Sequence, residues 1–198
     1  MRLRHTLSWF ALVIVFTTAL SLSAQEAVLE LDPAQTRIEF TLPGTTIRAV
    51  HGTFKLKSGT IRFNRATGKA GGSVDVDMTS EESDNVSLDR KILGDVLETR
   101  KYPEAAFIPD HIDGRLAAEG ESLLQLSGTF RLHGIEHDLM VETTLTRHGD
   151  QLTATTQFQV PYVDWGMRNP GGMLLRVGNQ VEINIKTVGR ITLPAAPH

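Results

Sequence analysis

The segment Ser87–Phe107, SLDRKILGDVLETRKYPEAAF, differs in pattern from the rest of the chain. Leu88, Ile92 and Val96 recur at every fourth position, with further leucines beside them. This spacing places apolar side chains on one side of a helix. The segment therefore predicts a single amphipathic helix in a chain otherwise made of strands.

The limits of this helix follow from its flanking residues. Asp84 or Ser87 is expected to cap its start, because short polar side chains accept hydrogen bonds from free backbone N–H groups. Tyr102-Pro103 is expected to end it, and Ala105 to begin the next strand. A lone helix among antiparallel strands often lies across the end of a barrel, so we expect this one to help close an apolar interior.

Alternation of apolar and polar residues predicts strands through most of the remaining sequence. In residues 37–42, Ile38, Phe40 and Leu42 share one face, which is typical of a strand with one face in water. The same pattern predicts strands at 52–57, 60–64, 73–79, 107–113, 122–132, 137–147, 151–160 and 180–193. Turns are expected at Ser58-Gly59, 64–68, 133–136 and 148–150, and an irregular loop at 161–179.

Roughly eight short strands with turns between them indicate a sandwich or an up-and-down barrel, and the pattern alone does not separate the two. Pro109 indicates that the strand 107–113 is bulged or lies at an edge. An exposed edge at this strand would allow two copies of the chain to pair as a homodimer. Because we find no internal repeat, linker or low-complexity segment, we expect residues 25–198 to form one domain.

The first 24 residues have the pattern of a secretory signal peptide. A basic start, MRLRH, precedes an apolar run from Leu7 to Leu22, and small residues follow at Ser23 and Ala24. A membrane anchor is the alternative, but a run of about 16 residues is shorter than the ~20 that a spanning helix needs. We therefore expect cleavage near residue 24, a periplasmic or secreted protein of bacterial type, and no stable membrane insertion afterwards.

Charge and cysteine content limit the partners and the environment. Cleavage would remove Arg2 and Arg4 and no acidic residue, which changes the net charge from −3 to −5. This charge argues against nucleic acid or an anionic membrane surface as the main partner. The chain has no cysteine, so an exported form would depend on its core without disulfides.

Residues that alternation directs toward the barrel interior are candidates for contact with an apolar ligand. From the strands these are Phe40, Leu42, Phe54, Phe63, Val76, Met78, Leu126, Phe130, Val141 and Ile183. From the helix, as a cover, they are Leu88, Ile92, Leu93 and Val96. The alternative is that the same side chains fill the centre, since small barrels are often packed solid.

Polar residues that are candidates for ligand or metal contact are less clearly marked in the sequence. The loop 162–168 combines Tyr162, Asp164, Trp165 and Arg168, which would orient a ligand headgroup or form a structural corner. His133 and His137 have the spacing of metal ligands on a helix, but they bracket a turn, so a metal site is not expected. No known catalytic motif occurs, and we expect no catalytic residues.

Motifs through the chain, in order, resemble the YceI family of bacterial exported proteins. They are Gly52-Thr53-Phe54, Gly59-x-Ile61-x-Phe63, Asp89-Arg90, Lys101-Tyr102-Pro103-x-Ala105-x-Phe107, Gly128-Thr129-Phe130-x-Leu132-x-Gly134-Ile135, Asp164-Trp165-Gly166 and Val177-Gly178-x-x-Val181-x-Ile183. The resemblance implies an all-β, eight-stranded antiparallel, lipocalin-like barrel with a short helical insertion that closes one end.

The resemblance also implies a function. A protein of this family is expected to bind, and to sequester or transport, a long-chain apolar amphiphile such as a polyisoprenoid, an isoprenoid quinone or a fatty acyl amide. No cofactor is expected apart from such a bound lipid or quinone. Two alternatives stay open: an enzyme that acts on a small amphiphile through His51, His111 or the 162–168 loop, and a packed barrel that works through protein contacts in an envelope stress response.

Overall fold

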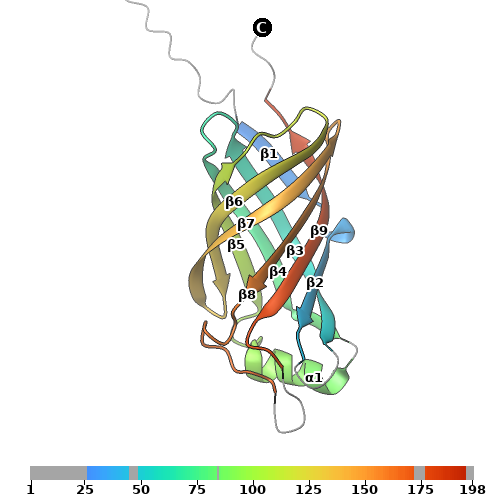
Figure 1. Cartoon of the computed structure of the whole chain (residues 1–198), viewed down its shortest axis with the longest axis vertical. Coiled ribbons are helices and arrows are strands. Elements are labelled where there is room, and N and C mark those ends of the chain that lie inside the picture. The colour runs from blue at the N-terminus through green and yellow to red at the C-terminus, as the bar shows by residue number, and fades with distance from the viewer. Residues whose placement is uncertain (1–25, 45–48, 84, 172–176, 195–198) are drawn as a thin grey trace, which may run out of the picture.

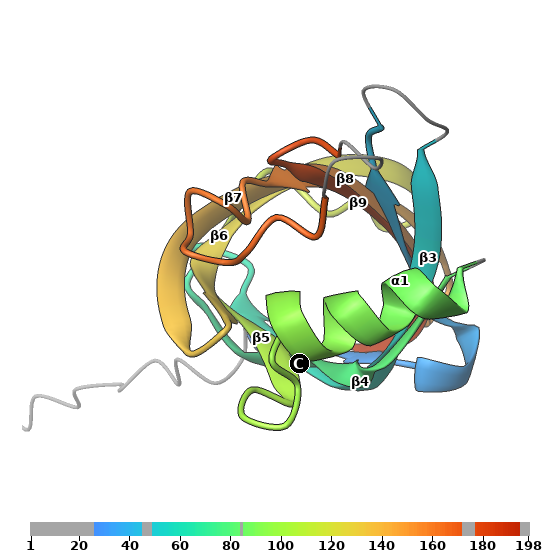
Figure 2. The same ribbon diagram turned by 90° about the horizontal axis from the view of Figure 1, so that it is seen from below.

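A computed structural model describes residues 26–44, 49–83, 85–171 and 177–194. These residues form one antiparallel sheet that closes into a barrel, and a short helix lies across one end (Figures 1 and 2). The strands are β1 (Glu26–Leu31), β2 (Arg37–Leu42), β3 (Val50–Asn64), β4 (Ala70–Ser83), β5 (Glu104–Asp113), β6 (Gly120–Leu132), β7 (Ile135–His148), β8 (Gln151–Val160) and β9 (Val181–Thr192).

Nine described strands occupy eight positions around the barrel, because β1 and β2 share one. Both pair antiparallel with β3 on one side and with β9 on the other. A short 3-10 helix, η2 (Pro33–Gln35), separates them, and the side chain of Asp32 accepts a hydrogen bond from the backbone N–H of Ala34 at its start. The prediction of an eight-stranded antiparallel barrel with a helix at one end is confirmed.

Two strand predictions are wrong. The sequence analysis placed no strand before Arg37, whereas β1 begins at Glu26. It also placed a turn at Ser58-Gly59, whereas β3 runs straight through these residues with a register shift against β4. A side chain at Gly59 would lie 2.7 Å from Leu31, so this glycine allows β1 to approach β3 rather than turning the chain.

The helix is shorter than predicted. An α-helical part, α1 (Val86–Lys91), continues as a π-helical turn, η3 (Ile92–Val96). The side chain of Asn85 caps its start in place of the expected Ser87; Asp84 lies outside the described residues. The helix ends before Glu98, which has a positive φ of 46°, so the turn that follows does not depend on Tyr102-Pro103.

The prediction that Pro109 lies in a bulged strand is confirmed. The register of β5 against β6 shifts between Pro109 and His111, which is a bulge. The strand is not an edge, because β5 pairs with β4 on one side and with β6 on the other.

The signal peptide predicted for residues 1–24 lies outside the described residues and stays a prediction. In the part of the chain that is described, we find no helix with the length and apolar character needed to cross a membrane.

Candidate functional site

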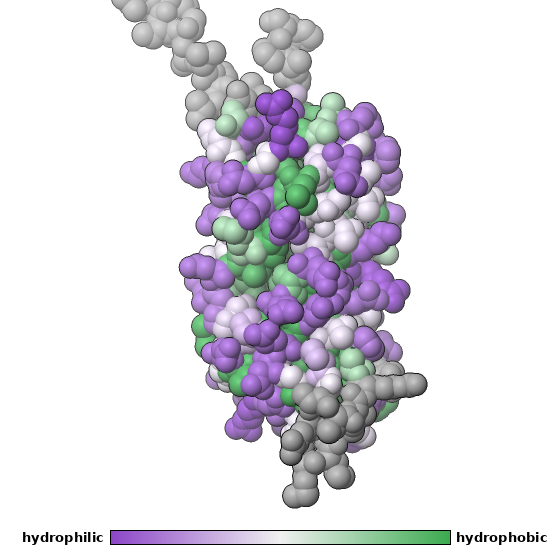
Figure 3. Space-filling model, viewed as in Figure 1, coloured by the Kyte–Doolittle hydropathy of each residue, from purple (hydrophilic) through white to green (hydrophobic). Residues whose placement is uncertain are grey.

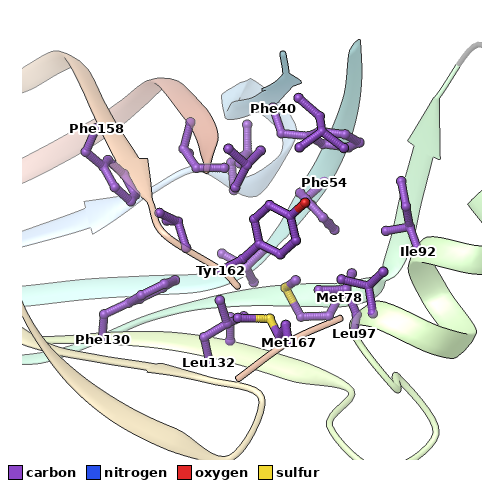
Figure 4. A pocket seen from close by; sticks show the side chains of 18 of the residues that line it. Phe40, Phe54, Met78, Ile92, Leu97, Phe130, Leu132, Phe158, Tyr162 and Met167 are labelled. Atoms are coloured by element: carbon purple, nitrogen blue, oxygen red, sulfur yellow. The ribbon is translucent and has the colours of Figure 1, made fainter. Parts of the chain in front are cut away.

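The barrel contains an apolar cavity of about 130 Å³ at the end that the helix covers. Figure 4 shows side chains from several strands, from the helix and from the loop after β8 converging on this space. The residues that line it are Ile38, Phe40, Leu42, Phe54, Val76, Met78, Ile92, Val96, Leu97, Ala105, Phe130, Leu132, Phe158, Val160, Tyr162, Met167, Pro170, Val181, Ile183 and Ile185.

A second apolar cavity, of about 140 Å³, lies further along the barrel. The two cavities are neighbours inside the barrel, because four residues line both of them: Val76, Phe130, Phe158 and Ile185. Hydroxyl groups in the second cavity are largely engaged, since Thr187 bonds with Thr36 and Thr156 donates to the carbonyl of Glu142. An interior of this kind stays dry and favours an apolar guest.

The one phenol in the first cavity is held by the protein itself. The Tyr162 hydroxyl donates a hydrogen bond to the carbonyl oxygen of Gly178 at 2.7 Å. Burial raises the pKa of Tyr162 to about 12, so the group stays protonated and keeps this bond. Tyr162 therefore contributes its ring to the cavity, while its hydroxyl anchors the loop after β8.

Fewer of the predicted helix residues cover the cavity than expected. Ile92, Val96 and Leu97 line the first cavity, whereas Leu88 is buried in the surrounding core and Leu93 is half-buried away from it. The backbone N–H of Leu97 bonds to the carbonyl of Ile92, five residues earlier, as in a π-helix. This wider turn changes which side chains face inward, and Leu97 lines the cavity whereas the predicted Leu93 does not.

Trp165 closes the barrel wall beside the cavity rather than lining it. Its ring stacks on His137, with centroids 3.8 Å apart and planes at 6°, and lies 6.0 Å from Phe130. The other histidine of the pair, His133, contacts Glu98 at 2.7 Å. The two histidines thus have different neighbours, and no group of three or more metal-binding side chains occurs within the described residues.

A polar opening of about 630 Å³ lies at the far end of the barrel from the helix. Arg65, His111, Asp113 and Arg115 line its rim. Its floor is apolar and consists of residues that also line the second cavity: Phe63, Ile112, Leu116 and Leu124. His51 lies at the start of β3, toward the helix end, so it is not brought together with His111.

Glu81 is a buried carboxyl group near the end of β4. Only 6% of it is exposed, and neither carboxylate oxygen has a hydrogen-bond partner among the described residues. Burial, followed by the charges of Asp89 and Glu82, raises its pKa to about 7. Its side chain is therefore largely protonated below neutral pH.

Most of the predicted ligand contacts line the interior. Ten line the first cavity: Phe40, Leu42, Phe54, Val76, Met78, Ile92, Val96, Phe130, Tyr162 and Ile183. Phe63, Leu126 and Val141 line the second. In the described part of the chain, Leu88, Leu93 and Trp165 line neither. Sequence reasoning missed others, among them Leu97, Leu132, Phe158, Val160 and Met167.

Comparison with known proteins identifies the family of this chain. The family model described as the YceI-like domain matches residues 29–189. The chain belongs to the YceI family. A UPF0312 protein of Pseudomonas savastanoi pv. phaseolicola is 25% identical over 181 residues, covering 85% of this chain and 90% of that protein.

Two solved structures share the fold of this chain. A polyisoprenoid binding domain from Saccharophagus degradans has a TM-score of 0.67 and 16% identity, covering 83% of this chain and 98% of its own. BcnA of Burkholderia cenocepacia has a TM-score of 0.64 and 16% identity, covering 80% and 98%.

Proposed function

We propose that this protein binds a long-chain apolar amphiphile in its barrel and sequesters or transports it without covalent chemistry. The observation that carries the proposal is the pair of neighbouring apolar cavities, covered at one end by the helix. The alternative of a packed barrel predicted no such space. A structural relative described as a polyisoprenoid binding domain makes a polyisoprenoid, an isoprenoid quinone or a fatty acyl amide the ligand class to test.

Burial of the hydrocarbon chain supplies the binding free energy. Each buried CH₂ group contributes about 0.8 kcal/mol, so a 20-carbon chain gains about 16 kcal/mol before the costs of association. An apolar cavity of about 150 Å³ accommodates a benzene-sized guest. A longer chain must therefore span both cavities and displace side chains, and Met78 and Met167 provide flexible walls for this.

The proposal extends to cellular context. A mature chain of residues 25–198 would act in the periplasm or outside the cell, with the bound lipid or quinone as its one small-molecule partner and with no other cofactor. The helix end and the rim of Arg65 and Arg115 offer two different surroundings for the polar end of the ligand.

Titration with decylubiquinone and with cis-parinaric acid tests the proposal. Val76→Phe enlarges a side chain that lines both cavities and is expected to weaken the binding of both ligands by at least tenfold. Thr155→Phe, on the exposed outer face of β8, is the matched control and should leave affinity unchanged. No binding by the unaltered protein, or equal binding by both variants, would overturn the proposal. An enzyme would instead show turnover that is lost with His111→Ala.

A further inference from the structure

The wall of the barrel is incomplete between β7 and β8. Their paired register covers Thr143–His148 against Gln151–Thr156 and ends at the pair Thr143–Thr156. Toward the helix end, residues 135–142 of β7 and 157–160 of β8 have no register with each other. Those same residues are fully paired on their other sides, with β6 and with β9. We call this interval, 135–142 against 157–160, the seam.

The other interrupted junction is closed again by hydrogen bonds. β4 and β5 pair over Val74–Asp77, and beyond the bulge at Pro109 the chain forms a bridge between Lys69 and His111. The backbone N–H of Ile112 also donates to the carbonyl of Gly68 at 2.8 Å. The seam differs because no ladder resumes between it and the end of the barrel within the described residues.

Two side chains that face inward along the seam are more exposed than leucines on the paired part, whereas Val141 and Val160 of the seam are buried. Leu139 and Phe158 both line the second cavity and are half-buried. Leu145 and Leu152, on the paired part of the same two strands, are 6% and 2% exposed. The second cavity is therefore less well covered from solvent at Leu139 and Phe158 than at Leu145 and Leu152. Figure 3 shows apolar groups among polar ones on the face that carries β6, β7 and β8.

The two ends of the interior are closed more firmly. At the helix end, Ile92, Val96 and Leu97 are buried side chains of the cover. At the far end, Leu116 and Leu124 are buried beneath the polar opening. A hydrocarbon chain entering at either end would have to displace packed core residues.

Contact between two rings covers the helix end of the seam. Trp165 comes from the loop after β8 and stacks on His137 of β7. The buried Nε2 atom of His137 has no hydrogen-bond partner among the described residues. The two sides are thus joined here by stacking rather than by a ladder, and separating the rings breaks no hydrogen bond of that atom.

We propose that the seam is a lateral portal for the hydrocarbon chain of the ligand, and that the Trp165–His137 stack is its gate. The inference rests on the proposed function. It assigns to the seam the same ligand class, an isoprenoid or unbranched hydrocarbon chain. A side opening lets this chain slide into the cavities, and lets a chain longer than the two cavities extend outward.

Cross-linking across the seam tests the portal directly, since the chain has no cysteine of its own. Met140→Cys with Gln159→Cys puts thiols on exposed positions of β7 and β8 that face each other if the register is extended across the seam. A bismaleimide would join them. Thr144→Cys with Thr155→Cys, a register pair on the paired part, is the matched control. Ser83→Cys with Asp89→Cys would tether the helix to β4, because these side chains already contact each other.

Stopped-flow fluorescence of cis-parinaric acid gives the rates. The cross-linked seam is expected to slow association and dissociation by at least tenfold, with the Kd changed less than twofold, while the other two cross-links leave the rates unchanged. Trp165→Ala should speed both rates several-fold, and Trp165→Phe should not.

Unchanged rates with the seam cross-linked, or slow rates with the helix tethered, would overturn the portal while the binding function stands. Failure of the protein without cross-links to bind the probe would overturn both.

Discussion

Replacing Glu81 with Gln should remove most of the pH dependence of stability between pH 4.5 and 7. The carboxyl group is 6% exposed and unpaired among the described residues, and burial raises its pKa from 4.5 to about 7 in the folded protein. The folded state therefore binds a proton more tightly than the unfolded chain does. The stabilising effect is complete below pH 4.5 and is lost as the pH rises through 7.

The magnitude follows from the two pKa values. At about 1.4 kcal/mol for each tenfold change in proton affinity, the rise from 4.5 to about 7 corresponds to about 3 kcal/mol of unfolding free energy. Repulsion by Asp89 on α1 and by Glu82 on β4 is already part of this rise, because each would repel an ionised Glu81. Helix α1 packs against β4 and continues into η3, which covers the cavity. This cover is therefore the region most affected.

Urea unfolding between pH 4.5 and 8 measures this effect. In residues 25–198 the one tryptophan is Trp165, so its fluorescence reports on the helix end of the barrel. The Glu81→Gln protein should lose about 3 kcal/mol less than the unaltered protein over this range. Glu121→Gln, at an exposed position of β6 whose charge does not act on Glu81, is the control and should follow the unaltered protein. An unchanged slope in Glu81→Gln would refute the reasoning.

Three further substitutions test the packing. Leu152→Ala, at a fully buried position of β8, should lower the unfolding free energy in urea by about 2–5 kcal/mol. Asn85→Ala should lower it by about 0.5–2 kcal/mol, since the Asn85 side chain caps Leu88 N–H; circular dichroism melts would show this, and no change would contradict the cap. Tyr162→Phe should cost about 1 kcal/mol through loss of the bond to Gly178 without weakening ligand titrations, whereas a large loss of affinity would make the hydroxyl a ligand contact.

Alternation along a strand is a local property, and it therefore predicted most inward positions correctly. Phe40, Met78 and Ile183 line the cavity that their parity indicated. Glu81 is an inward position that this alternation does not reach, because a long bulge intervenes: four residues of β4, 78–81, lie opposite one residue of β3. Such a bulge reverses which face a residue occupies, and nothing in the local pattern announces it.

Contacts between distant segments explain the other misses. Ser58-Gly59 has the composition of a turn, but the glycine is needed for contact with Leu31, which lies far away in sequence. The stack of Trp165 on His137 joins two segments whose proximity depends on closure of the barrel. The loop contributes Met167 to the cavity for the same reason, and no periodicity marks that residue.

Mass spectrometry of an organic extract of the protein, purified from a bacterial envelope without added ligand, tests the central claim most directly. Our account predicts a long-chain apolar amphiphile at close to one molecule per chain, retained by Thr155→Phe and lost from Val76→Phe. An extract free of such a molecule, or one equally loaded in both variants, would contradict the account.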